Sequence, residues 1–500
     1  MKRFWIFLLS VGLIMAFGTT VFAADAKFNG EFYLQGWYNK NASLIDQDST
    51  VGPSYRGSTA FYTQRLRMGM EFNVARGLKL VTRFDALERK WMAARRAAPA
   101  GGASPGYAST DSEAENIAFE VAYLQFALPV GMFAIGNIPA SNNNFGSPYG
   151  ENHGFSSGVM SYTYAKGAWY ISAGYKRSTD GYVKTTSGTW PMGTPGTPIG
   201  AGTDNDSTTY SISTGYRWKG GAAGLHIGDV RSRTANVPHP GGSTNTVSRK
   251  TEIPYGSIWF QQKFGRFFIE DEFGICPFGD YVKWNEPFTP IYPYYKNIEA
   301  DMAISNYFGI NIDLSPVKLG FFFIYSRGDD PETMDKKEGG FRQVLDLDRD
   351  FNPCLILFNE SYMQWMGPNG TGGATQQAAI IGNTTAANGI NTYVQNVWLY
   401  QLNGDYKVTP KLNIGASFTY AYADKKPTNT GYPTAYGGKT YLSDEYGYEA
   451  DLTLKYKIFD NLEYMVGAAY LWTGDYFKGI DDKVKLSNNY LLTHKLTLTF

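Results

Sequence analysis

The chain has 500 residues, with 45 Lys and Arg against 45 Asp and Glu, so its formal net charge is zero. This balance argues against a nucleic-acid partner, which would favour a basic chain. Glycine (56) and tyrosine (37) are both abundant, a mixture that disfavours a helical protein and is typical of many strands joined by turns.

The first 23 residues have the organisation of a secretory signal peptide. Two basic residues precede an apolar run over residues 4–17, and Val21 and Ala23 occupy the −3 and −1 positions of a cleavage site. The apolar run is shorter than the roughly 20 residues that a membrane-spanning helix needs. We therefore expect export and a near-neutral mature chain from residue 24 to residue 500. The alternative is an uncleaved amino-terminal anchor.

Apolar and polar residues then alternate with a period of two in many separate segments. In the segment 62–74, the alternating residues are Leu66, Met68, Met70, Phe72 and Val74 against Arg65, Arg67, Glu71 and Asn73. As a helix this segment would spread its charges around its whole surface, whereas as a strand it confines them to one face. The same pattern recurs in residues 28–38, 78–85, 412–422 and 446–456.

Short and long connections alternate between these segments. Tight turns are predicted at 75–77, 129–131, 165–167, 220–221, 264–266, 314–316, 408–410 and 459–461. Long polar loops are predicted at roughly 41–58, 92–115, 140–157, 179–208, 233–253, 276–302, 328–394, 424–444 and 474–488. Together they join about eighteen strands, with sixteen as the alternative count.

This order predicts an all-β fold, namely a transmembrane antiparallel up-and-down β-barrel with short periplasmic turns and long extracellular loops. Closure removes the edge strands that an open sheet of this size would expose. We expect a single barrel domain over residues 24–500, without a separate plug.

The final strand ends in an alternating apolar stripe that is interrupted at His494. Its members are Tyr490, Leu492, Leu496, Leu498 and Phe500. The stripe resembles the carboxyl-terminal signature by which the assembly machinery recognises outer-membrane barrels of Gram-negative bacteria. The resemblance implies an outer-membrane location in such a bacterium, contact with its lipid and lipopolysaccharide, and recognition of Phe500 by the barrel-assembly machinery.

Energetics decide which face of a strand meets lipid. An arginine on the lipid side near the bilayer midplane costs roughly 2–4 kcal/mol, so the charged faces are expected to line a water-filled lumen. The predicted pore-lining residues are Arg65, Arg67, Glu71, Arg83, Asp85, Glu120, Glu449, Asp451 and Lys455.

The tight turn at residues 75–77 predicts how two of these strands pair. With Arg67 opposite Asp85, Glu71 lies diagonal to Arg83 and within its reach. Arg65 then has an apolar residue opposite it, so it is predicted to be the unpaired positive charge of this wall. The charges either steer solutes or form a compensated ladder that only keeps the wall hydrated.

Residues 121–137 (VAYLQFALPVGMFAIGN) resemble a strand–turn–strand unit of the general porins of Gram-negative bacteria. The resemblance implies that residues 140–157 form an inward constriction loop, and it leaves a homotrimer open as the assembly. That loop offers Asn142, Asn143, Asn144 and Glu151. The chain departs from the porin pattern at Asn137, where an arginine is frequent.

Residues 448–477 and 328–341 resemble segments of alginate-export-type channels and related porins. Eighteen strands fit that group. Export of an acidic polysaccharide requires a densely basic pore, whereas the charges predicted for this lumen are of both signs.

The longest loop, 328–394, carries two further candidates. Asp346, Asp348, Asp350 and Asn352 place oxygen atoms at alternate positions, as calcium-binding loops do, but Phe351 and Leu357 replace the Gly and Glu of an EF-hand. A solvated acidic loop is the alternative to a calcium site. The apolar run 354–358 is expected to pack inside the barrel mouth or against a partner.

Cysteine and histidine give weak signals. Cys276 and Cys354 could form one disulfide or remain free thiols. The four histidines, His153, His226, His239 and His494, have no catalytic partner close in sequence, so an enzyme is not expected.

The sequence thus predicts a porin for passive diffusion of small hydrophilic solutes, without a cofactor. Two alternatives remain, namely a substrate-specific or export channel for an acidic saccharide, and an interaction barrel that holds a partner protein through its large loops.

Overall fold

The computed structural model describes residues 25–41, 44–50, 57–91, 117–139, 155–179, 206–238, 246–284, 297–333, 335–339, 352–359, 394–428, 434 and 437–500. The predicted signal peptide, residues 1–23, lies outside them. No helix in this part of the chain is long and apolar enough to cross a membrane.

A single sheet contains nineteen strands, of which β14 (Lys336–Lys337) has two residues and belongs to a loop. In the first half the strands are β1 (Asp25–Lys40), β2 (Ser58–Ala75), β3 (Leu78–Lys90), β4 (Ile117–Leu128), β5 (Gly131–Pro139), β6 (Phe155–Lys166), β7 (Trp169–Thr179), β8 (Ser207–Trp218) and β9 (Gly221–Pro238). The second half contains β10 (Thr246–Phe264), β11 (Phe267–Trp284), β12 (Ile298–Leu314), β13 (Val317–Ser326), β15 (Val397–Thr409), β16 (Leu412–Tyr422), β17 (Glu445–Phe459), β18 (Leu462–Thr473) and β19 (Asn489–Thr499).

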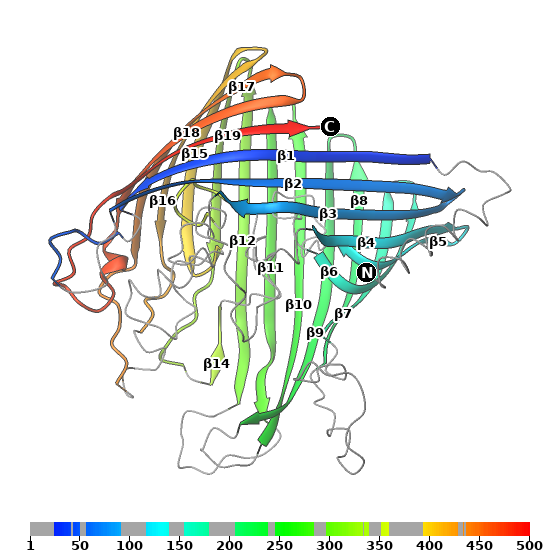
Figure 1. Ribbon diagram of the computed structural model, residues 1–500. Coiled ribbons are helices and arrows are strands. Elements are labelled where there is room, and N and C mark those ends of the chain that lie inside the picture. Colours follow the sequence, from blue (N-terminus) through cyan, green and yellow to red (C-terminus); the bar gives the residue numbers. More distant parts are fainter. Residues whose placement is uncertain are drawn as a thin grey trace, which may run out of the picture.

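The sheet closes on itself because the first strand pairs with the last. Phe32 of β1 lies opposite Leu66 of β2 on one side and Leu498 of β19 on the other, and both pairings are antiparallel. Figure 1 shows β1 and β19 side by side, with β10, β11 and β12 in another part of the wall. The fold is therefore a closed antiparallel barrel of eighteen strands, and the predicted fold class is confirmed.

Tight turns join the strands at one end of the barrel and long connections join them at the other. All eight predicted tight turns are present, since only a few residues separate the strands of the pairs β2/β3, β4/β5, β6/β7, β8/β9, β10/β11, β12/β13, β15/β16 and β17/β18. Gly77 and Gly265 adopt positive φ angles of 81° and 59° in two of these turns, a backbone conformation that other residues rarely adopt.

Two predicted loops are shorter than the composition suggested. β9 continues to Pro238 and β11 to Trp284, so strand structure covers much of the predicted loops 233–253 and 276–302. Near the loop end a strand can carry polar residues on both faces, because water rather than lipid surrounds it. Polarity therefore marks the end of the apolar belt rather than the end of the strand.

The two faces of the wall differ in chemistry. Large apolar side chains lie exposed on the outer face at alternate positions, among them Ile212, Ile258, Leu402, Phe418 and Leu452. The residues between them point inward, and they include the charged side chains of β2, β3, β11 and β17. This separation suits a barrel with lipid outside and water inside.

Candidate functional site

The inner face of β2–β4 carries a network of ion pairs. The Arg67 guanidinium donates to both carboxylate oxygens of Asp85, at 2.7 and 2.6 Å, and to Glu120 at 3.0 Å. Arg67 lies directly opposite Asp85 in the strand pairing, as predicted. The planar fork of an arginine fits a carboxylate in this two-point arrangement, which fixes both side chains.

Arg65 also belongs to this network, so the prediction that it is unpaired is wrong. Its guanidinium lies 3.1 Å from Glu31 of β1 and 3.9 Å from Asp85. The pairing of β2 with β3 is irregular between Gln64 and Leu66, so no residue of β3 lies directly opposite Arg65. Its ion-pair partner lies on β1, the other neighbour of β2. The turn between β2 and β3 does not determine that contact.

The predicted contact between Glu71 and Arg83 is also wrong. Glu71 pairs with Lys79 at 2.9 Å, while Arg83 pairs with Glu120 at 2.9 Å. Glu120 lies in a bulge of β4 next to Arg83. It is therefore closer to Arg83 than Glu71, the predicted diagonal partner. Three arginines therefore meet three carboxylates on this wall, which makes it hydrated and close to neutral.

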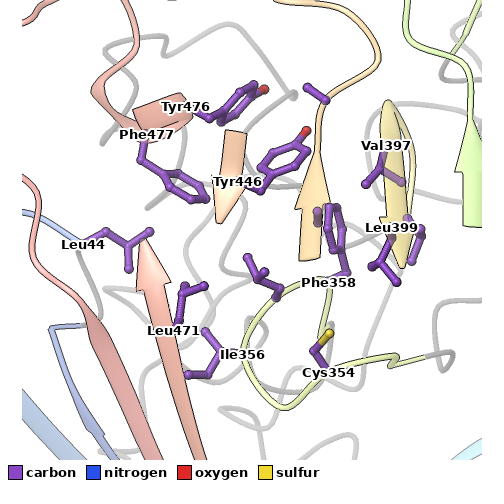
Figure 2. Packing of buried hydrophobic residues seen from close by; sticks show 14 of the residues in the cluster. Leu44, Cys354, Ile356, Phe358, Val397, Leu399, Tyr446, Leu471, Tyr476 and Phe477 are labelled. Carbon is purple, nitrogen blue, oxygen red and sulfur yellow. The ribbon is translucent and has the colours of Figure 1, made fainter. Parts of the chain in front are cut away.

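An apolar cluster lies on the inner face of β15–β18, where the loop between β13 and β15 enters the lumen. Residues 352–359 (NPCLILFN) fold against this wall. Leu357 and Phe358 are 1% and 0% exposed, and the apolar cluster around them takes side chains from eight spanning strands, β1, β12, β13 and β15–β19. In Figure 2, Ile356 lies near Leu471 of β18 and Phe358 near Leu399 of β15.

Polar side chains of the wall bind the backbone of this inserted segment, residues 352–359. The backbone N–H groups of Ile356 and Leu357 each donate to one carboxylate oxygen of Glu449, both at 2.7 Å. Gln401 of β15 donates to the carbonyl oxygen of Pro353 at 2.6 Å. Glu449 is 0% exposed; a buried carboxylate needs such donors, because desolvation otherwise disfavours its charge.

Asp451 lies two residues further along β17 on the same face. Ser417 donates to its Oδ2 at 3.0 Å, while its Oδ1 is buried and accepts no hydrogen bond within the described residues. In that part of the chain neither Glu449 nor Asp451 forms an ion pair with a basic side chain. Within the described residues, backbone and hydroxyl donors rather than cations therefore hold the carboxyl groups of Glu449 and Asp451.

Of the two alternatives for the cysteines, the structure shows free thiols rather than a disulfide. Cys276 and Cys354 are both free and buried, and they belong to two separate apolar clusters, one on β9–β12 and one around the inserted segment. Burial, reinforced by the nearby Glu449 and Asp451, raises the pKa of the Cys354 thiol well above its ordinary value, so at neutral pH it stays protonated and unreactive.

Several predicted site residues lie outside the described part of the chain. They include the constriction loop with Asn142, Asn143, Asn144 and Glu151, and the calcium candidates Asp346, Asp348 and Asp350. Asn352 is described and opens the inserted segment. The described residues contain no cluster of three or more His, Cys, Asp or Glu that could hold a metal ion, and the calcium site stays a prediction.

One pair that sequence reasoning missed lies on the inner face of β8 and β9. Ser213 Oγ is 2.7 Å from His226 Nδ1, and Tyr255 Oη is 3.4 Å from the other ring nitrogen. Ser213 and His226 lie directly opposite each other in the strand pairing, but their separation in the sequence matches no known motif. Ser213 and His226 are only 4% and 3% exposed, so a solute in the lumen does not reach them, and we assign the pair a structural role.

Comparison with protein-family models and with curated proteins found no match. Three solved structures are similar in shape. OmpT of Vibrio cholerae is 10% identical at a TM-score of 0.36, covering 96% of this chain and 99% of that one. DcaP of Acinetobacter baumannii, an outer membrane channel, is 12% identical at 0.39 (95% and 97%). The outer membrane protein opdK of Pseudomonas aeruginosa is 8% identical at 0.42 (95% and 99%).

At these TM-scores and identities the similarity carries no argument about this chain. The chain's own geometry carries it: eighteen antiparallel strands close into a wall that is apolar outside and charged inside, which is the arrangement that a lipid bilayer and a wet lumen require. This chain therefore has the fold of a closed, membrane-spanning antiparallel β-barrel.

Proposed function

We propose that this protein is an outer-membrane channel through which small hydrophilic solutes diffuse passively, and that the inserted segment narrows its lumen. The observation that carries the proposal is the partly exposed ion-pair network on the inner wall. The side chains of Arg65 and Glu31 are 15% and 32% exposed, and charged groups at a dry protein interior would be far more expensive. A lumen that holds them contains water.

The selection mechanism is sieving by size. The inserted segment occupies lumen space on the side of β15–β18, and the arginine network on β2–β4 lines the space that remains. Because each arginine of that network has an acidic partner, the network adds little net field. Size therefore dominates over charge in deciding which solutes pass.

Liposome swelling tests this proposal directly. Purified protein reconstituted into liposomes should admit a pentose faster than a disaccharide, and a disaccharide faster than a tetrasaccharide. Protein-free liposomes and heat-unfolded protein are the controls. A folded protein that admits none of these sugars would refute the channel, whereas a strongly anion-selective reversal potential would favour an export route for an acidic saccharide.

A further inference from the structure

A lysine pair lies on the inner wall, one row of residues nearer the tight turns than the inserted segment. Strand pairing places Lys455 of β17 opposite Met465 of β18, and Met465 opposite Lys495 of β19. The next row towards the loops contains Gly467, where an added Cβ would lie 3.4 Å from Leu355 of the inserted segment. The row of Lys455 and Lys495 is therefore the neighbour of the row that the inserted segment approaches.

An aromatic ring holds one of these lysines in position. The Lys495 ammonium lies 4.4 Å from the centroid of the Tyr33 ring, and the Arg65 guanidinium lies 5.0 Å from the same centroid. The electron-rich face of a ring attracts a cation but does not neutralise its charge. Two cationic side chains, from β2 and β19, thus share one ring on this stretch of the wall.

Of the two nearby carboxylates, one forms an ion pair with another cation and the other lies opposite a different lysine. The charged groups that act electrostatically on Lys495 are Glu31, Arg65, Lys455 and Glu463. Glu31 is the ion-pair partner of Arg65, and Glu463 lies opposite Lys457 in the strand pairing. Among the described residues neither Lys455 nor Lys495 forms an ion pair with a carboxylate, so this row carries a net positive charge.

We propose that Lys455 and Lys495 form a binding site for small solutes with two or more negative charges. This proposal rests on the proposed channel and names a class of solute for it. Neighbouring strands lie about 4.8 Å apart, so the two backbones, separated by one strand, are roughly 10 Å apart. Because lysine side chains are long and flexible, both ammonium groups can contact one solute that carries carboxylate or phosphate groups. The positive charge of this row also attracts such anions to the narrowing.

The test compares wild type with the double variant Lys455→Gln/Lys495→Gln in detergent and in planar bilayers. Binding of citrate and of pyrophosphate, followed by isothermal titration calorimetry at low salt, should weaken at least tenfold in the variant. The reversal potential in a KCl gradient should move from a modest anion preference towards zero or cation preference. Added KCl should weaken binding to the wild type, because salt screens charges.

Two controls separate charge from folding. Lys455→Arg/Lys495→Arg keeps both charges and should retain binding, and Lys166→Gln removes a charge at the end of β6, outside the lumen, and should change nothing. Binding that is equal in wild type and in the Gln double variant would overturn the site, as would binding of neither anion. Intact, lysine-dependent binding without any conductance would keep the site and refute the channel.

Discussion

At the scale of single residues, the ion pairs of the inner wall differ in how much they stabilise the barrel. The Asp85 side chain is 3% exposed and has Arg67 as its two-point partner, whereas Lys79 and Glu71 are 40% and 31% exposed. A buried charge that loses its partner is strongly destabilising, while an exposed pair contributes little. Removing the positive charge of Arg67 should therefore destabilise the barrel more than removing that of Lys79.

Arg67→Ala should lower the free energy of unfolding by about 3–5 kcal/mol, because it leaves Asp85 buried without its main partner. Lys79→Ala, which removes a more exposed cation, should lower it by less than about 1 kcal/mol. Urea titration of the refolded proteins in detergent micelles measures both. Equal losses in the two variants would contradict the role given to Arg67.

A second residue, Glu449, is the anchor of the inserted segment. A buried donor that loses its hydrogen-bond partner costs about 1–3 kcal/mol, and Glu449 accepts hydrogen bonds from the buried N–H groups of Ile356 and Leu357. Removing them should release the segment and expose Cys354. Its thiol pKa, raised by burial, would then fall towards the ordinary value, so more thiolate forms at neutral pH and alkylation accelerates.

Glu449→Ala should therefore speed the labelling of Cys354 by a maleimide at least tenfold, measured by mass spectrometry in a Cys276→Ser background at pH 7. Glu463→Ala, on the same inner wall but away from the segment, is the matched control and should label at the parental rate. If the folded Glu449→Ala protein labels as slowly as its parent, Glu449 does not hold the segment in place.

At the scale of elements, the strands and the tight turns follow from local pattern, and the contacts of the loop do not. Alternation with period two and eight short turns give the strand number and place Arg67 opposite Asp85. The partner of Arg65 comes from β1, across a long connection, and a register irregularity adjoins it. No pattern within one hairpin contains that information.

The inserted segment shows the same limit. The apolar run 354–358 in a polar loop signals burial, and the sequence left open whether it packs in the barrel or on a partner. Its place was decided by Gln401 and Glu449, which stand on strands far along the chain and resemble any other inward polar residue. Of the constriction loop implied by resemblance at residues 140–157, residues 140–154 lie outside the described part of the chain and residues 155–157 begin β6. The narrowing proposed here is the segment 352–359.

At the scale of the whole molecule, Phe500 extends the pairing of β1 and β19 that closes the barrel. The N–H of Phe500 donates to the carbonyl of Gly30 at 3.0 Å, and the N–H of Gly30 donates back at 2.8 Å. These bonds lie at the end of the seam between β1 and β19, where the first and last strands complete the barrel (Figure 1). The terminal residue therefore has a backbone role in addition to the proposed recognition of its ring.

Deleting Phe500 should lower the free energy of unfolding in micelles by roughly 1–3 kcal/mol, because two backbone hydrogen bonds are lost. Phe500→Leu keeps both hydrogen bonds, so its free energy of unfolding should be close to that of wild type. If the assembly machinery recognises the aromatic ring, less of this variant should reach the outer membrane. Heat-modifiable mobility on gels and membrane fractionation measure the two effects. A Phe500→Leu protein that assembles normally in cells would contradict the recognition.

The central claim is that residues 352–359 narrow a water-filled lumen, and single-channel conductance tests it most directly. Replacing residues 353–358 with a Gly-Ser sequence of equal length removes the apolar packing and keeps the loop length. The conductance of this variant in planar bilayers at high KCl should be clearly larger than that of wild type, and the variant should admit larger sugars into liposomes. Equal conductance and equal size limits in the two folded proteins would contradict the account.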